Sequence, residues 1–89
     1  MKNKDFENGI VRIEMKKSNR LIVGEITKIS PGLIVISRYY RWKDAVEQDM
    51  IFRNHISKIT VLKPNVEYMS KSENLQAIKH YFKEQKEEK

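Results

Sequence analysis

Apolar and charged residues alternate near the start of the chain. Every second residue from 11 to 16 is apolar, which is the period of a strand with one buried face. A polar break at residues 17–20 suits a hairpin connection, and a second strand is predicted over residues 21–29. Gly24 lies inside this second strand, where a glycine usually marks a bulge or a sharp bend.

Residues 30–32, Ser-Pro-Gly, are the clearest turn signal in the chain. Proline presets φ at the first corner, and glycine accepts the positive φ that a type II turn requires at the second. The apolar run 33–36 predicts a strand covered on both faces, which extends to Trp42. Residues 43–49 are mostly charged and predict a connection between strands.

A polar corner follows between two further apolar runs. These runs, residues 50–52 and 59–62, predict the fourth and fifth strands. The corner places Arg53, Asn54 and His55 side by side at a strand end, where their donors can converge on an anionic ligand. The alternative interpretation is an ordinary polar corner whose side chains satisfy strand-end carbonyl groups.

A C-terminal helix is predicted from its start signal and its apolar stripe. Pro64 ends the sheet because it has no N–H to donate, and Ser70 with Glu73 fits a capping box. The stripe lies at i, i+3 and i+7 and consists of Leu75, Ile78 and Phe82, with Tyr81 beside it. We expect it to dock on the sheet or on a neighbouring subunit, not on a membrane, because the polar face carries both signs of charge.

These elements predict a mainly β fold of five antiparallel strands in meander order, followed by one helix. Short strands and a bend at a glycine indicate a small, strongly bent barrel, and SH3-like, OB-like and Sm-like barrels all have a suitable strand order. The predicted parts are a polar leader (1–8), the barrel (9–63), a linker (64–69), an amphipathic helix (70–83) and a frayed tail (84–89).

Composition narrows the functional classes. The 89 residues and 39% hydrophobic content suit one domain with a small core, which favours a marginal monomer or an oligomer. The chain has no cysteine, which excludes a disulfide scaffold, and it has no apolar run of membrane-spanning length. We expect a cytoplasmic protein. The net charge of +6 favours a polyanionic partner, above all nucleic acid.

Enzyme chemistry has little support in the sequence. It has no cysteine nucleophile, no glycine-rich phosphate loop and no convincing acid pair. His55 and His80 lie in unlike segments and lack the spacing of a metal site. We therefore expect no catalysis, no cofactor and no metal.

Residues 52–59, Phe-Arg-Asn-His-Ile-Ser-Lys-Ile, resemble the second signature of the Sm-like (LSm/Hfq) family, and in particular its Hfq branch. In that branch the signature is an aromatic residue, Lys, His, Ala, Ile, Ser, a free position and an aliphatic residue. Residues 21–26 and 33–36 resemble the second and third strands of the family. The resemblance implies an open, SH3-type Sm-like barrel whose fourth and fifth strands pair with neighbouring subunits in a homo-hexameric or heptameric ring.

The same resemblance implies binding of single-stranded RNA, by a non-catalytic RNA chaperone or assembly platform. Ring closure would repeat Arg53 around a central hole. Asn54 stands where the Hfq branch has its histidine, and His55 stands at its alanine. Gly32 stands where the family has a base-stacking aromatic residue, so a different mode of uridine binding is expected. The candidate RNA contacts are Arg53, Asn54, His55, Ser30, Pro31 and Gly32, with Lys16, Lys17 and Arg20 as a second basic edge.

Residues 38–42, Arg-Tyr-Tyr-Arg-Trp, have two interpretations. Interleaved basic and aromatic residues are typical of nucleic-acid platforms. Strand alternation, however, places Tyr40 and Trp42 on one face, which favours a core or a subunit interface. The rival function is a protein-interaction module of SH3-like or Tudor-like type that docks a protein through residues 38–42 or the C-terminal helix. A third possibility is a ring that keeps its scaffold and has lost RNA binding.

Overall fold

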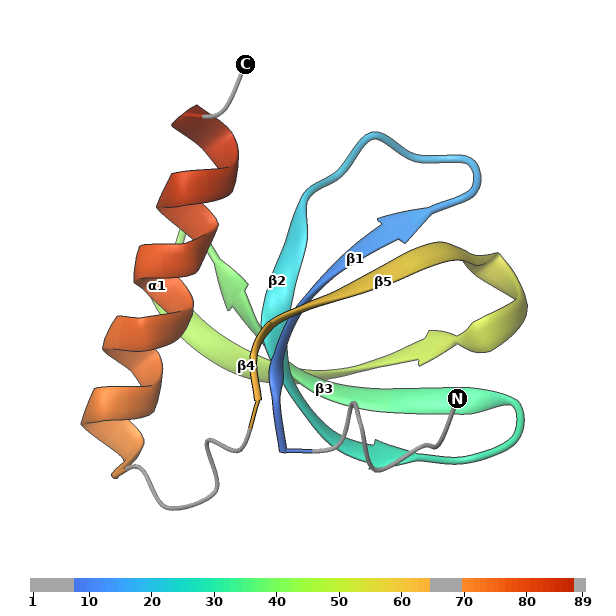
Figure 1. The fold of residues 1–89 in the computed structure, drawn as a ribbon, viewed down its shortest axis with the longest axis horizontal. Helices are drawn as coiled ribbons and strands as arrows, with labels where there is room; N and C mark the ends of the chain where they lie inside the picture. The colour runs from blue at the N-terminus through green and yellow to red at the C-terminus, as the bar shows by residue number, and fades with distance from the viewer. Residues whose placement is uncertain (1–7, 65–69, 88–89) are drawn as a thin grey trace.

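The computed structural model describes residues 8–64 and 70–87. These residues form one antiparallel sheet and one helix, so the predicted mainly β class is confirmed (Figure 1). The elements are β1 (Ile10–Met15), β2 (Ile22–Ile29), β3 (Leu33–Tyr40), β4 (Ala45–Phe52), the short 3-10 turn η2 (Arg53–His55), β5 (Ile56–Lys63) and α1 (Lys71–Glu87). Most of the predicted leader and linker, and the last two residues of the predicted tail, lie outside the described residues.

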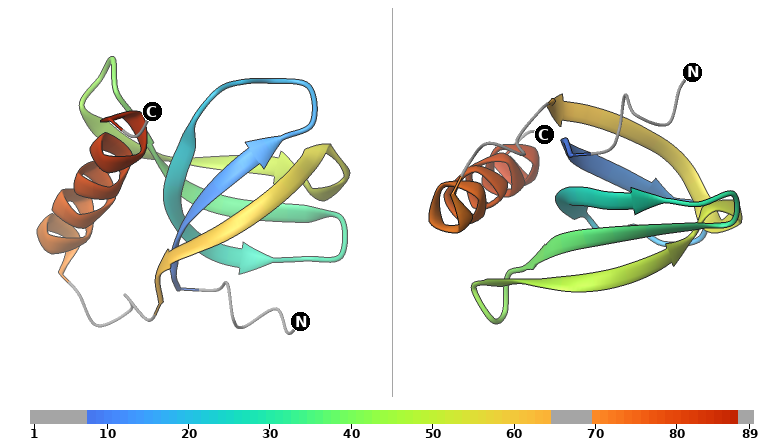
Figure 2. Two further views of the ribbon diagram at one scale, coloured as in Figure 1. Left: turned by 45° about the horizontal axis from the view of Figure 1, so that its top comes forward. Right: turned by 90° about the horizontal axis from the view of Figure 1, so that it is seen from below.

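The strand order of the sheet is β4-β3-β2-β1-β5. The first four strands form a meander as expected, but β5 returns to pair with β1 and not with β4. The meander prediction is therefore wrong for the last strand. The sheet is strongly curved, as Figure 2 shows, but it is not closed, and β4 and β5 are its two open edges.

Side chains from the two faces of the sheet form separate hydrophobic clusters. The inner cluster fills the concave side and includes Ile13, Ile26 and Ile36, all fully buried. The outer cluster lies between the sheet and α1. It contains Ile10, Val23, Tyr39, Ile78 and Phe82, with ring centroids of Tyr39 and Phe82 5.1 Å apart. The sheet is thus buried on both sides only where the helix covers it.

Gly24 allows the close approach of β2 and β3. A Cβ atom built at this position would lie 2.3 Å from the carbonyl oxygen of Ser37 and 2.7 Å from the Cα of Arg38. Gly24 therefore marks a close backbone contact, and the predicted bulge does not lie at this residue. The register shift of this strand pair lies farther along, between Ile26 and Lys28.

Three predictions between residues 30 and 49 are wrong. The turn at residues 30–32 forms, but no described glycine has positive φ, so it is not the predicted type II turn. Burial alternates along residues 33–36, because only the inner face of β3 is covered there. Residues 45–49 belong to β4, so the connection between β3 and β4 is only Arg41–Asp44, and Trp42 lies beyond the end of β3.

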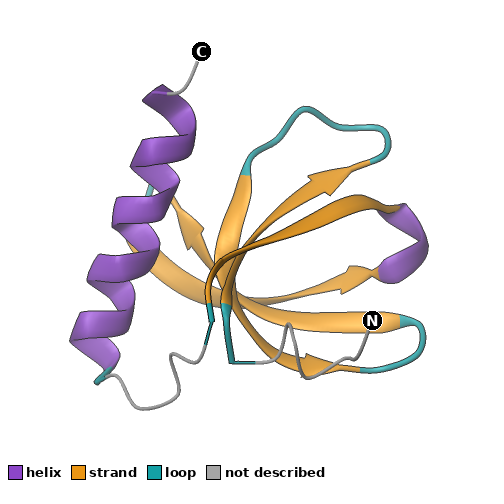
Figure 3. Ribbon diagram, viewed as in Figure 1, coloured by secondary structure: helices purple, strands orange, loops and turns teal. Residues whose placement is uncertain are grey.

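The helix prediction is confirmed, including its start. The backbone N–H of Glu73 donates to Ser70 Oγ at 3.2 Å, and the N–H of Ser70 donates to Glu73 Oε1 at 2.9 Å, which completes the capping box. The helix continues to Glu87, beyond the predicted end at residue 83 (Figure 3). Ile78 and Phe82 are buried against the sheet, as the stripe predicts. In the described segments, no helix has both the length and the apolar character that crossing a membrane requires.

Candidate nucleic-acid interface

The corner between β4 and β5 is fixed by two backbone hydrogen bonds to neighbouring connections. Phe52 and Ile56 are extended on either side of η2, so the three residues between them make one tight turn. The N–H of Arg53 donates to the carbonyl oxygen of Gly32 at 3.1 Å, and the N–H of Lys16 donates to that of His55 at 2.9 Å. Three connections that are far apart in the sequence therefore meet at one end of the sheet (Figure 1).

The Arg53 side chain lies against the turn at residues 30–32. Its Nη1 donates to the carbonyl oxygen of Ser30 at 3.2 Å. Within the described residues its guanidinium makes no ion pair, and the side chain is exposed. One edge of the guanidinium is thus held in place, and its remaining donors are available to an anion.

Asn54 and His55 line a cavity with the start of the β1–β2 connection. The cavity has a volume of about 490 Å³ and is lined by Met15, Lys16, Lys17, Ser18, Asn54 and His55. None of these residues is acidic. The His55 ring meets the Phe52 ring edge to face, with centroids 5.7 Å apart, which orients the imidazole. An anionic or polar ligand in this cavity would meet lysine ammonium groups, an amide and an imidazole.

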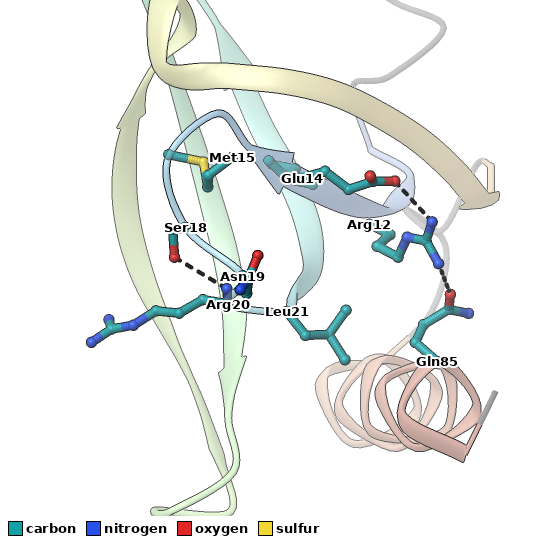
Figure 4. Close-up of a pocket in the computed structure, with 9 residues that line it drawn as sticks. Arg12, Glu14, Met15, Ser18, Asn19, Arg20, Leu21 and Gln85 are labelled. Carbon is teal, nitrogen blue, oxygen red and sulfur yellow. Dashed lines mark hydrogen bonds and ion pairs between the residues drawn. The ribbon is translucent and has the colours of Figure 1, made fainter. Parts of the chain in front are cut away.

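Arg20 does not belong to this group. Its backbone N–H donates to Ser18 Oγ at 3.1 Å, and Figure 4 shows its side chain pointing away from Arg12. It lines a different pocket, with residues 38–42 and Phe82. Of the predicted RNA contacts, the structure brings together Arg53, Asn54, His55, Ser30, Pro31, Gly32, Lys16 and Lys17, which we call the basic end.

The pocket drawn in Figure 4 is a poor site for an anion. It has a volume of about 340 Å³, and the two arginines that line it are the partly buried Arg12 and the exposed Arg20. The Arg12 guanidinium already donates to Glu14 Oε2 at 2.8 Å and to Gln85 Oε1 at 2.6 Å. Its charge is therefore compensated by the protein itself.

An apolar patch on the outer face of β3 and β4 was not predicted from the sequence. Leu33 lies opposite Phe52, and Val35 lies opposite Met50. Phe52 is 60% exposed and Met50 65% exposed, so both side chains lie outside the core of the single chain. The signal that could have revealed the patch is the alternation of residues 46–52, which the charged residues obscured.

The other apolar residues of the predicted corner do face the core. Ile56, Ile59 and Val61 are partly buried against the inner cluster. As edge-strand residues they keep part of their surface exposed.

Comparisons with known proteins give no further guide. No family model matches the chain, and no curated protein or solved structure does so either. The described residues contain no group of three or more His, Cys, Asp or Glu side chains that could hold a metal ion. The functional argument therefore rests on the geometry of this chain.

Proposed function

We propose that the chain binds single-stranded RNA at the basic end, as a ring-forming Sm-like protein that acts as a non-catalytic RNA chaperone or assembly platform. The observation that carries this proposal is the meeting of η2, the turn at residues 30–32 and the β1–β2 connection at one end of the sheet. Lys16 and Lys17 of the β1–β2 connection line a cavity with Asn54 and His55 of η2, and this lining contains no carboxylate.

The chemistry of the basic end suits a phosphate backbone with exposed bases. Arg53 offers a planar fork of donors, while Lys16 and Lys17 offer point charges. The side-chain amide of Asn54 can both donate to and accept from a base edge. Gly32 offers no ring for stacking, so contacts to phosphate and to base edges would dominate at this end.

Assembly through the open edges would complete the proposal. β4 and β5 are eight residues long each, and each has one unpaired side. Unpaired N–H and C=O groups along an edge favour pairing with another strand. Pairing of β4 from one subunit with β5 from the next would satisfy both edges, and closure of the ring would repeat Arg53 once per subunit.

Light scattering coupled to size-exclusion chromatography tests the assembly. The ring predicts a single species of six or seven times the subunit mass of 10.6 kDa. A strictly monomeric species at micromolar concentration would refute the ring and leave an SH3-like or Tudor-like module.

Fluorescence anisotropy with a labelled single-stranded RNA tests the binding site. If Arg53, Lys16 and Lys17 each neutralise one phosphate, the affinity should fall about 20-fold between 50 and 200 mM salt, from a slope of roughly −0.7 per contact. Arg53→Ala should weaken binding and reduce the slope by about 0.7. Lys83→Ala, which removes an exposed charge from α1, is the matched control and should bind as the wild type does. Equal affinities of Arg53→Ala and wild type would exclude the basic end as the RNA site.

A protein scaffold without RNA binding is a second candidate, which the exposed Met50 and Phe52 favour. It predicts an oligomer that persists in high salt, is disrupted by Phe52→Ser, and shows no saturable RNA binding at low salt.

A further inference from the structure

The connection between β3 and β4 lies at the opposite end of this hairpin from η2 (Figure 2), and it contains Trp42. This residue is the only tryptophan in the chain and is 79% exposed. The expectation that it belongs to a core or lies on a strand face with Tyr40 is wrong, because β3 ends at Tyr40. Among the described residues most of the indole surface is left open to solvent, although exposing a large aromatic surface to water is unfavourable.

The tip that carries Trp42 is held by specific contacts. Asp44 has φ of 52°, an uncommon conformation for a residue with a side chain. Its carboxylate accepts a hydrogen bond from the Tyr39 hydroxyl at 2.6 Å and an ion pair from Lys79 of α1 at 2.9 Å. These contacts, the hydrogen bond first, lower the pKa of Asp44 below its usual value. The indole is therefore presented by a hairpin tip that is anchored to the helix.

Lysine and arginine side chains lie near this tryptophan. The Lys43 ammonium lies 4.8 Å from the centre of the Trp42 ring. A shallow cavity of about 330 Å³ is lined by Arg20, Leu21, Arg38, Tyr39, Tyr40, Arg41, Trp42 and Phe82, none of them acidic. Arg38 and Lys43 are paired with Asp49 and Glu47. In the described part of the chain, by contrast, the guanidinium groups of Arg20 and Arg41 form no ion pair.

We propose that this surface, Trp42 with Arg20 and Arg41, is a second binding site for single-stranded nucleic acid. One base stacks on the indole, and the flanking phosphates contact the two guanidinium groups. Stacking on an exposed aromatic residue tolerates any base, and unpaired guanidinium groups beside it match the charge of the backbone. The site shares its ligand class with the basic end but none of its residues.

A nucleic acid fits this surface better than a lipid bilayer does. Insertion into a membrane interface requires several neighbouring apolar side chains. The residues next to Trp42 at the tip, Arg41, Lys43 and Asp44, are all charged and exposed. A single ring among charges is suited to stacking, not to insertion.

Intrinsic fluorescence gives a direct test, because Trp42 is the only indole. Titration of the full chain with a 12-nucleotide single-stranded RNA should quench the emission in a saturable way, and the same sequence as a duplex should quench it much less. Arg41→Ala and Arg20→Ala should each weaken the quenching curve several-fold, with Lys83→Ala as the charge-matched control that leaves it unchanged. Trp42→Ala, checked for folding by circular dichroism, should weaken the binding of labelled RNA by about 5- to 150-fold.

Combination with Arg53→Ala separates this proposal from the function proposed above. If RNA still quenches Trp42 emission in Arg53→Ala, the Trp42 site is independent of the basic end. This conclusion holds even if the anisotropy experiment excludes the basic end as an RNA site. RNA binding without any change in emission overturns the Trp42 site and leaves the basic end intact. Quenching abolished by Arg53→Ala also overturns it, because the signal then originates at the basic end. A blue shift of the Trp42 emission on addition of anionic vesicles, without any quenching by RNA, would indicate a membrane-binding surface. That result would also overturn the proposed nucleic-acid site.

Discussion

The sharpest prediction concerns the close approach of two backbones at Gly24. Alanine adds one methyl group, which would lie 2.3 Å from the carbonyl oxygen of Ser37 and 2.9 Å from its carbonyl carbon. The atoms in the way belong to the backbone of β3, so no side-chain rotation can relieve the contact. To reach 3.4 Å, the lower limit of an ordinary contact, β2 and β3 must separate by about 1 Å.

The expected loss of stability follows from that displacement. Overpacking of a buried site typically costs 1–3 kcal/mol, and we expect about 3 kcal/mol here, because the shift also lengthens the hydrogen bonds of a central strand pair. For a domain of this size, each kcal/mol lowers Tm by roughly 4–8 °C. Gly24→Ala should therefore lower Tm by about 12–24 °C. Strand propensity alone predicts the opposite sign, since alanine is favoured over glycine in a strand by roughly 0.5–1 kcal/mol.

Gly32→Ala is the matched control for this experiment. A Cβ atom at Gly32 has no neighbour within 4 Å, and φ there is not positive. The substitution should leave stability unchanged or raise it by about 0.4–1 kcal/mol. Urea and thermal unfolding followed by far-ultraviolet circular dichroism, at one fixed protein concentration, measures both variants. A free energy of unfolding for Gly24→Ala within about 0.5 kcal/mol of the wild type would refute the reasoning.

Three further predictions concern the helix and the hairpin tip. Ile78→Ala should destabilise the protein by about 2–5 kcal/mol in urea unfolding, because Ile78 is fully buried between helix and sheet, whereas His80→Ala on the exposed face should change stability by less than about 0.5 kcal/mol. Ser70→Ala should cost about 1 kcal/mol and speed hydrogen exchange in the first turn of α1; unchanged exchange would contradict the capping box. The lowered pKa of Asp44 contributes stability that is present above about pH 4 and is lost as the pH falls through the folded-state pKa. Asp44→Asn should therefore lose less stability than wild type on acidification from about pH 5 to 2. An equal loss of the free energy of unfolding in both proteins over this range would disprove the effect.

The sequence predicts the strands best where one face is buried and the other polar. The alternation at residues 11–16 corresponds to β1, in which Ile13 faces the inner cluster and Arg12 faces outward. The capping box of Ser70 and Glu73 was equally predictable from the sequence, because it is a local interaction. Local patterns thus identified four strands and the start of the helix.

The missed half of β4 shows where pattern reading fails. The charges of Glu47 and Asp49 led to the prediction of a loop over residues 43–49. In the structure, however, Asp49 accepts hydrogen bonds from Arg38 and Tyr40 of the neighbouring strand. Desolvation raises the pKa of Asp49, and these hydrogen bonds, with one from its neighbour's N–H, outweigh it and lower the value. Charged side chains that find partners across a ladder can belong to an edge strand without any apolar pattern.

The candidate site was predictable in part. Arg53 to His55 were identified from one local corner, and their proximity to Lys16 and to residues 30–32 depends on pairings across the whole sheet. The direction of Arg20 and the exposure of Trp42 depend on where β2 and β3 begin and end. Neither was accessible without the tertiary structure.

The pairing of β5 with β1 also affects the order in which this chain can fold during its synthesis. Ile10 of β1 lies opposite Lys63 of β5 in the sheet. The first of these strands to be synthesised therefore pairs with the last one. Until β5 arrives, β1 has a free edge, and Ile10 and Val23 on the outer face are uncovered until α1 follows. Contacts between residues so far apart in the sequence slow folding. Until they form, the nascent chain exposes strand edges that can pair with other chains. The sheet therefore cannot be completed before β5 has been synthesised.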